Sequence, residues 1–107
     1  MSVSTHVLDA VTGRPAEGLT VLLERSESDG WAVVSEGQTD ADGRIKGLAP
    51  DTAAGVYRAT FETGAYFGAT PTLYPQVVVV FEVVDAQAHH HVPLLLSPFA
   101  YSTYRGS

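Results

Sequence analysis

Short runs of β-branched and alternating residues, each ended by glycine, proline or aspartate, occupy almost the whole chain. The runs lie at residues 3–9, 19–25, 31–36, 44–48, 56–62, 77–84, 89–96 and 101–105. Only residues 63–70 suit a short helix, and two glycines weaken that segment as a helix former. Short strands at this spacing, with turn residues between them, predict an antiparallel β-sandwich or barrel.

The length of 107 residues sets the number of domains. It is enough for one hydrophobic core and too short for two. Hydrophobic residues make up 45% of the chain and charged residues 17%, a composition that excludes a disordered polypeptide. We find no internal repeat, linker or low-complexity segment, so residues 1–107 are predicted to form a single domain.

Charge and residue usage exclude several classes of function. The formal net charge is −6 and no cluster of lysine and arginine is present, which argues against binding of nucleic acid. Cysteine is absent, which excludes disulfides, thiol nucleophiles and cysteine metal sites and fits a reducing compartment. The longest apolar run, at residues 77–81 and resuming at 83–84, is too short to span a bilayer. With no recognisable signal peptide, we expect a cytoplasmic protein without membrane contact.

Period-two alternation predicts which side chains share a face of the sheet. If the aliphatic sides of the strands form the core, the opposite side carries His6, His91, Ser102 and Tyr104. Residues 77–81 are apolar on both sides, more than a lone sandwich requires. This pattern predicts outer faces buried against other subunits, although a central strand buried on both faces would explain it nearly as well.

The histidines are the strongest candidates for chemistry. His6 alone is more often an ordinary, partly buried residue, but an imidazole also suits general-base catalysis near neutral pH. The run His89-His90-His91 allows three interpretations. It is incidental, or His89 and His91 bind a metal with His6 as a third ligand, or His91 is an acid or base with tuning neighbours.

Residues 39–44, Thr-Asp-Ala-Asp-Gly-Arg, are predicted to form a turn. The segment resembles the start of a calcium loop but lacks the later ligands, including the glutamate at position twelve. Arg44 either begins a short surface strand or stabilises an anionic substrate or oxyanion. A serine nucleophile is not supported, because no Gly-x-Ser-x-Gly elbow is present.

Four segments together resemble the transthyretin-related 5-hydroxyisourate hydrolases. They are Ser-Thr-His-Val-Leu-Asp at 4–9, Asp-Gly-Arg at 42–44, His-Val-Pro-Leu-Leu-Leu-Ser-Pro at 91–98 and Tyr-Ser-Thr-Tyr-Arg-Gly-Ser at 101–107. The final Tyr-Arg-Gly-Ser is the most specific, because it separates the enzymes from the hormone-carrying transthyretins. The sequence departs from the family at His90, where an aromatic residue is expected between two histidines.

The resemblance implies a transthyretin-like antiparallel β-sandwich of two four-stranded sheets with one short helix. It also implies a homotetramer, a dimer of dimers, with active sites at the dimer–dimer interface. The implied reaction is hydrolysis of a ring amide of 5-hydroxyisourate, which gives 2-oxo-4-hydroxy-4-carboxy-5-ureidoimidazoline on the route from urate to allantoin. Neither a cofactor nor a metal is implied.

Carried onto this sequence, the resemblance makes His6, Arg44 and His91 the catalytic residues, with Tyr104 and Ser107 binding the substrate. In this interpretation the two histidines position and deprotonate a water, and Arg44 stabilises the developing negative charge. A non-catalytic, small-ligand-binding protein of the transthyretin type is the alternative. Metal dependence through the histidines also stays open at this stage.

Overall fold

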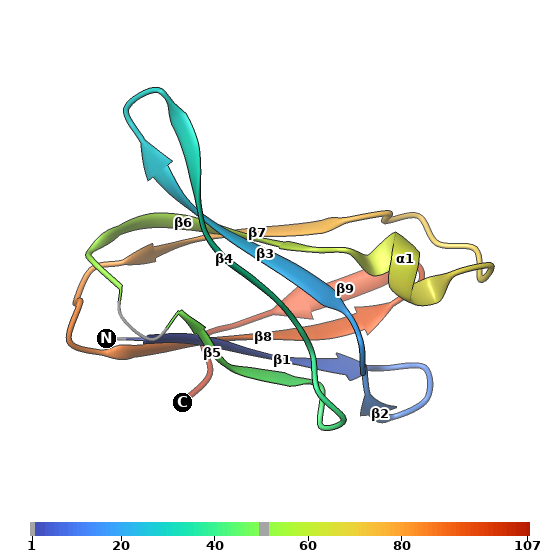
Figure 1. Cartoon of the computed structure of the whole chain (residues 1–107). Helices are drawn as coiled ribbons and strands as arrows, with labels where there is room; N and C mark the ends of the chain where they lie inside the picture. Colours follow the sequence, from blue (N-terminus) through green and yellow to red (C-terminus); the bar gives the residue numbers. More distant parts are fainter. Residues whose placement is uncertain (1, 50–51) are drawn as a thin grey trace.

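The computed structural model describes residues 2–49 and 52–107, and these form two β-sheets packed face to face with one short helix at the end of the sandwich (Figure 1). The elements in chain order are β1 Ser2–Asp9, β2 Arg14–Pro15, β3 Thr20–Glu27, β4 Gly30–Gln38, β5 Arg44–Ala49, β6 Gly55–Phe61, α1 Thr63–Phe67, β7 Val77–Val83, β8 His89–Ser97 and β9 Ala100–Thr103. Within the described residues, no helix is long and apolar enough to cross a membrane.

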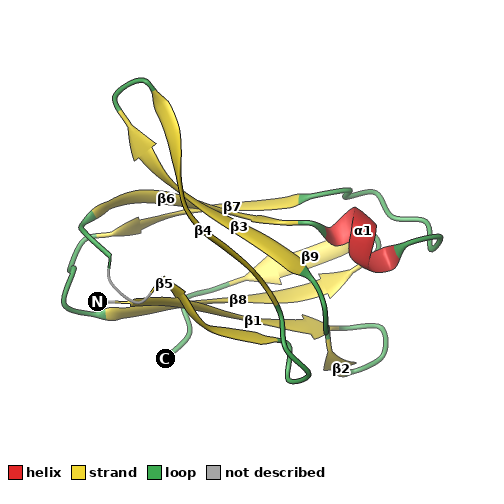
Figure 2. Cartoon of the chain, in the orientation of Figure 1, coloured by secondary structure: helices red, strands yellow, loops and turns green. Residues whose placement is uncertain are grey.

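The predicted all-β sandwich with one short helix is confirmed (Figure 2). One sheet has the strand order β4-β3-β6-β7, and the other has the order β2-β1-β8-β9 with β5 also paired to β1. Two details differ from the prediction. The two-residue strand β2 adds a fifth strand to the second sheet, and β1 and β8 run parallel rather than antiparallel.

Helix α1 ends at Phe67, three residues before the predicted end of the helix. Gly68 follows with a φ of 61°, a left-handed conformation that favours glycine and ends a helix. The Tyr66 hydroxyl on α1 donates a 2.8 Å hydrogen bond to the Asp9 carboxylate at the end of β1. Burial, together with this carboxylate, raises the pKa of Tyr66 to about 12, so the phenol stays a donor at physiological pH.

The core lies between the two sheets and follows the predicted alternation. In β1 the buried side chains Val3, Thr5 and Val7 face the core, and in β8 Val92 and Leu94 do the same. The opposite side of both strands therefore forms the outer face of the sheet. We call this surface, made by β1, β5, β8 and β9, the outer face.

Strand β7 is apolar on both sides, as predicted, but it is an edge strand. Val77 and Val79 are buried in the core, whereas Val78 and Val80 are 45% and 57% exposed. The explanation of a central strand buried on both faces is therefore wrong. Two exposed valines on a sheet edge leave an apolar surface uncovered in the single chain.

Candidate active site

Strand register brings the predicted catalytic residues to one region of the outer face. Strand β1 lies between β5 and β8. His6 on β1 is paired with Arg44 on β5, and Ser4, two residues earlier, is paired with His91 on β8. Because residues two apart on a strand share a face, these four side chains lie on the same side of the sheet.

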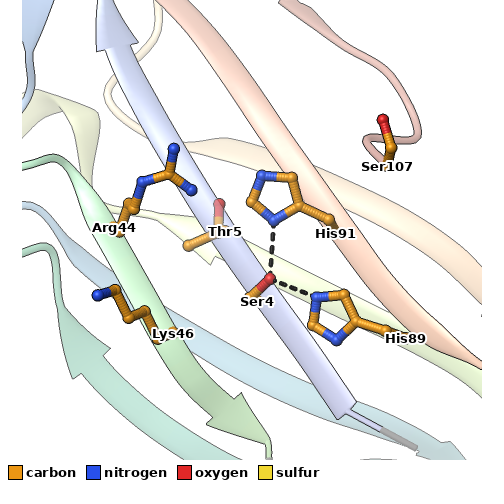
Figure 3. Close-up of a pocket in the computed structure, with 7 residues that line it drawn as sticks. All are labelled: Ser4, Thr5, Arg44, Lys46, His89, His91 and Ser107. Carbon is orange, nitrogen blue, oxygen red and sulfur yellow. Dashed lines mark hydrogen bonds between the residues drawn. The ribbon is translucent and has the colours of Figure 1, made fainter.

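A cavity of about 310 Å³ opens where these strands meet (Figure 3). It is lined by Ser4, Thr5, Arg44, Lys46, His89, His91 and Ser107. In Figure 3 the side chains of Arg44 and His91 point toward each other from β5 and β8 across β1. A volume of this size is at the lower end for small-molecule sites.

The five predicted site residues are placed in three ways. Arg44, His91 and Ser107 line the cavity. His6 does not line it, but it is paired with Arg44 and is close enough to act electrostatically on His91. Tyr104 lies beyond the end of β9 and lines a neighbouring cavity of about 310 Å³, which it shares with His91 and residues of β7.

His91 is partly buried and lies close to the Arg44 guanidinium and to His6 and His89. Burial lowers its pKa below the ordinary value of 6.5, and the Arg44 guanidinium, His6 and His89 lower it further. The neutral imidazole therefore predominates at physiological pH. A neutral imidazole beside a guanidinium is suited to accept a proton while the guanidinium stabilises negative charge.

A tight turn fixes Arg44 at the start of β5. The Asp40 carboxylate accepts hydrogen bonds from the backbone N–H of Asp42 at 2.9 Å and of Arg44 at 3.0 Å. The bond from Arg44 is the main reason why the pKa of Asp40 lies below its ordinary value. Gly43 has a φ of 73°, and a Cβ there would lie 2.4 Å from the carbonyl oxygen of Val7. The predicted turn thus holds the Arg44 backbone against β1.

The guanidinium of Arg44 forms no ion pair within the described residues. In the part of the chain that the structure describes, the one ion pair joins Arg58 to Glu24; Arg44 and Lys46 act on the Asp40 carboxylate only at longer range. Two cations therefore line one cavity in a chain of net charge −6. They favour a substrate or transition state with negative charge on oxygen.

The C-terminal segment packs directly on the ring of His91. The backbone N–H of Gly106 donates a 2.9 Å hydrogen bond to the carbonyl of His91, which places Ser107 beside the cavity. A Cβ on Gly106 would lie 2.4 Å from Cδ2 of His91 and 3.2 Å from Cγ of Pro93. Only glycine allows the chain to approach the imidazole this closely.

The sequence prediction missed Ser4, Thr5 and Lys46 as cavity residues and gave His89 no settled role. Alternation was a usable signal for two of them, because Ser4 shares its face with His6 and Lys46 shares its face with Arg44. Thr5 had no such signal: its side chain faces the core, where its hydroxyl donates a 2.6 Å hydrogen bond to the carbonyl of Val92.

The metal interpretation of the histidines required a third ligand. Across residues 2–49 and 52–107, no group of three histidine, aspartate or glutamate side chains is arranged to hold an ion. The rings of His89 and His91 are stacked with centroids 6.4 Å apart, and both are hydrogen bonded to Ser4. These contacts meet a requirement of the third interpretation, because Ser4 and His89 lie beside His91.

Fold and site together define a small β-sandwich protein with a cavity lined by histidine and arginine on the outer face of one sheet. The chain belongs to the HIUase/Transthyretin family, whose model matches residues 3–106, and the predicted family is thereby confirmed. A 5-hydroxyisourate hydrolase of Salmonella typhimurium is 49% identical over 109 residues, covering 98% of this chain and 80% of the relative.

Solved structures agree with the family and show how widely its fold is used. A Klebsiella pneumoniae 5-hydroxyisourate hydrolase superposes with a TM-score of 0.88 at 38% identity and covers all of both chains. Sea bream transthyretin in complex with thyroxine superposes with a TM-score of 0.91 at 34% identity, covering 99% of this chain and 95% of that one. Enzymes and carriers therefore share this sandwich, and the fold alone does not separate them.

Proposed function

We propose that the protein is a 5-hydroxyisourate hydrolase, which opens the ring of 5-hydroxyisourate by hydrolysing a ring amide. The product is 2-oxo-4-hydroxy-4-carboxy-5-ureidoimidazoline, an intermediate between urate and allantoin. The observation that carries this proposal is the neutral imidazole of His91 facing the guanidinium of Arg44 across one cavity. Relatives named as this hydrolase, 40–49% identical to the chain, support it over the transthyretin-type carrier.

In the proposed mechanism, His6, Arg44 and His91 are catalytic. His91, aided by His6, accepts a proton from water as the water oxygen attacks the ring carbonyl. Arg44 stabilises the negative charge that develops on the carbonyl oxygen. The imidazolium then returns its proton to the ring nitrogen as the C–N bond breaks, so that no cofactor is consumed. Tyr104 and Ser107 are proposed to bind the substrate.

The carrier alternative would use the same outer face without turnover. Binding a ligand does not require a general base, whereas this face carries histidines held against a guanidinium. The ultraviolet absorbance of freshly generated 5-hydroxyisourate decides between the two functions. Decay accelerated by catalytic amounts of the protein is expected for the hydrolase, and decay at the spontaneous rate from folded protein would leave only the carrier.

We also propose a homotetramer, a dimer of dimers with the sites at the dimer–dimer interface. Its support is the exposed apolar surface of the single chain, which includes Val78 and Val80 on β7 and Leu95 on the outer face. Native mass spectrometry tests it, and a monomer at micromolar concentration would contradict it.

We further propose a cytoplasmic location for the protein, which cell fractionation tests.

The pH dependence of kcat/KM should reflect the lowered pKa of His91. The general base must be unprotonated, so activity is lost as the pH falls through this pKa. Because the pKa lies below 6.5, we expect the acid limb of the profile to have its midpoint below 6.5. Replacing Arg44 with glutamine removes one cause of the shift and should move that midpoint upward. A midpoint above 6.5 in the unaltered protein would contradict the assignment.

Replacing Gly106 with alanine should disturb catalysis through His91. The new methyl group would overlap the imidazole, so the ring or the C-terminal backbone must shift from its present position. A displacement of about 1 Å in a catalytic group can cost about a hundred-fold in rate, and we expect a loss of that order. Gly47→Ala is the matched control, since a Cβ at Gly47 in β5 has nothing within 4 Å. Equal rates for the two variants would contradict the prediction.

A further inference from the structure

The hydroxyl of Ser4 lies between two imidazoles. Its Oγ is 2.7 Å from Nδ1 of His91 and 2.9 Å from Nε2 of His89 (Figure 3). The other ring nitrogen of His89, Nδ1, is hydrogen bonded to the hydroxyl of Ser2. Ser4 is only 7% exposed, so its hydrogen bonds are made to these rings rather than to bulk water. The result is a continuous chain of four side chains that ends at His91.

The bond to Nδ1 rather than Nε2 shows what kind of role Ser4 can have. In Ser-His-Asp hydrolases the nucleophile is bonded to Nε2 of the histidine, and the group that orients the ring is bonded to Nδ1. Ser4 occupies the orienting position. In Figure 3 the nitrogen of His91 that Ser4 does not contact is directed toward Arg44. Ser4 therefore contacts Nδ1 of His91, and not the ring nitrogen that is proposed to act on the substrate.

The single hydroxyl proton of Ser4 couples the tautomers of its two partners. A serine hydroxyl donates one hydrogen bond, so if it donates to one ring nitrogen it must accept from an N–H on the other. In one arrangement Ser4 donates to His91, whose proton then sits on Nε2. In the other, His91 donates from Nδ1–H to Ser4, and Ser4 donates to Nε2 of His89. Only the second leaves Nε2 of His91 free to accept a proton.

We propose that Ser4 is a positioning residue that holds His91 in the Nδ1–H tautomer, with Nε2 as the proton acceptor and His89 as the next link. The inference deepens the proposed hydrolase function and rests on it. It differs from a nucleophilic role, because Ser4 forms no bond to the substrate. Removing Ser4 should weaken the base without removing it.

The charges around His91 favour this tautomer. The groups that act on its ring are Arg44 from β5, His6 from β1 and His89 from β8. Arginine has only donors, so an N–H on Nε2 would be directed toward another donor, whereas a lone pair there would be directed toward positive charge. When Nε2 accepts a proton from water, Nδ1–H still donates to Ser4. The orienting bond therefore persists through the proton transfer.

The tautomer can be measured directly, without an enzyme assay. In nitrogen-15 NMR spectra of histidine-labelled protein, the two ring nitrogens of neutral His91 are distinguished by whether each carries a proton. The expected result is a protonated Nδ1 and an unprotonated Nε2 in the unaltered protein. Protonated Nε2 would overturn the inference. Because this measurement needs no substrate, it remains decisive even if the protein proves not to hydrolyse 5-hydroxyisourate.

Variants of Ser4 supply the kinetic test. For Ser4→Ala we expect kcat to fall about ten- to a hundred-fold with KM nearly unchanged, a smaller loss than removal of the base itself. Ser4→Thr retains the hydroxyl and should restore most of the rate. Ser102→Ala on β9 is the control, since Ser102 is an exposed serine on the same face. Wild-type kcat in Ser4→Ala, or a covalent adduct on Ser4, would overturn the proposal.

Discussion

Replacing His91 with alanine is expected to lower kcat/KM for 5-hydroxyisourate by about a hundred- to ten-thousand-fold. The expectation follows from the position of its imidazole, which is kept neutral by burial and by the Arg44 guanidinium. Figure 3 shows this imidazole and the Arg44 guanidinium directed toward each other across β1. The ultraviolet decay assay measures the loss, and circular dichroism establishes that the variant is folded.

The neighbouring histidine provides the matched control for this prediction. His90 is buried on the core side of β8, where its Nδ1 is hydrogen bonded to the carbonyl of Ala88. His90→Tyr restores the aromatic residue that the family resemblance implies at this position, and its activity should stay near that of the unaltered protein. Small-molecule imidazole should partly restore the rate of His91→Ala. Full activity of His91→Ala in the absence of added imidazole would contradict the assignment of His91 as the general base.

The fold could be predicted from the sequence to the extent that it depends on local patterns. Alternation identified the core sides of β1 and β8, and Asp42-Gly43 identified the turn before β5. Strand pairing depends on contacts far apart in the chain, so alternation could not reveal that β1 and β8 run parallel. It also could not place β7 at an edge. Short runs such as Arg14–Pro15 carry too little pattern to be recognised as a strand.

The site was predictable where family resemblance and alternation agreed, and less so elsewhere. His6 and His91 were placed on one face because both lie within regular strands. Tyr104 was extrapolated from β9, but that strand ends at Thr103 and the chain then turns to pair Gly106 with His91. Residues beyond the end of a strand no longer follow its alternation. The approach of Gly106 to the ring therefore became visible only in three dimensions.

Replacing Arg44 with lysine is expected to remove most of the activity, although the positive charge is kept. Removing an oxyanion partner costs about a hundred- to a thousand-fold, and Arg44→Ala should lose that much. Lysine presents a compact ammonium in place of a planar fork with fixed donors, so Arg44→Lys should recover little of the loss. Lys46 already supplies an ammonium at the cavity. A second ammonium at position 44 would supply positive charge but not the paired, planar N–H donors of arginine.

Arg14→Lys makes the same chemical change at an exposed position on β2 and should leave kcat/KM unchanged. If Arg44→Lys were as active as the unaltered protein, the guanidinium would act only as a point charge, and the proposed stabilisation of the oxyanion by Arg44 would be wrong.

The loss of activity in Arg44→Lys should appear in kcat more than in KM, because charge on the carbonyl oxygen is greatest in the transition state. A loss confined to KM would instead make Arg44 a residue that binds the ground state of the substrate. Kinetics of Arg44→Lys thus separate two roles that its guanidinium could serve equally well.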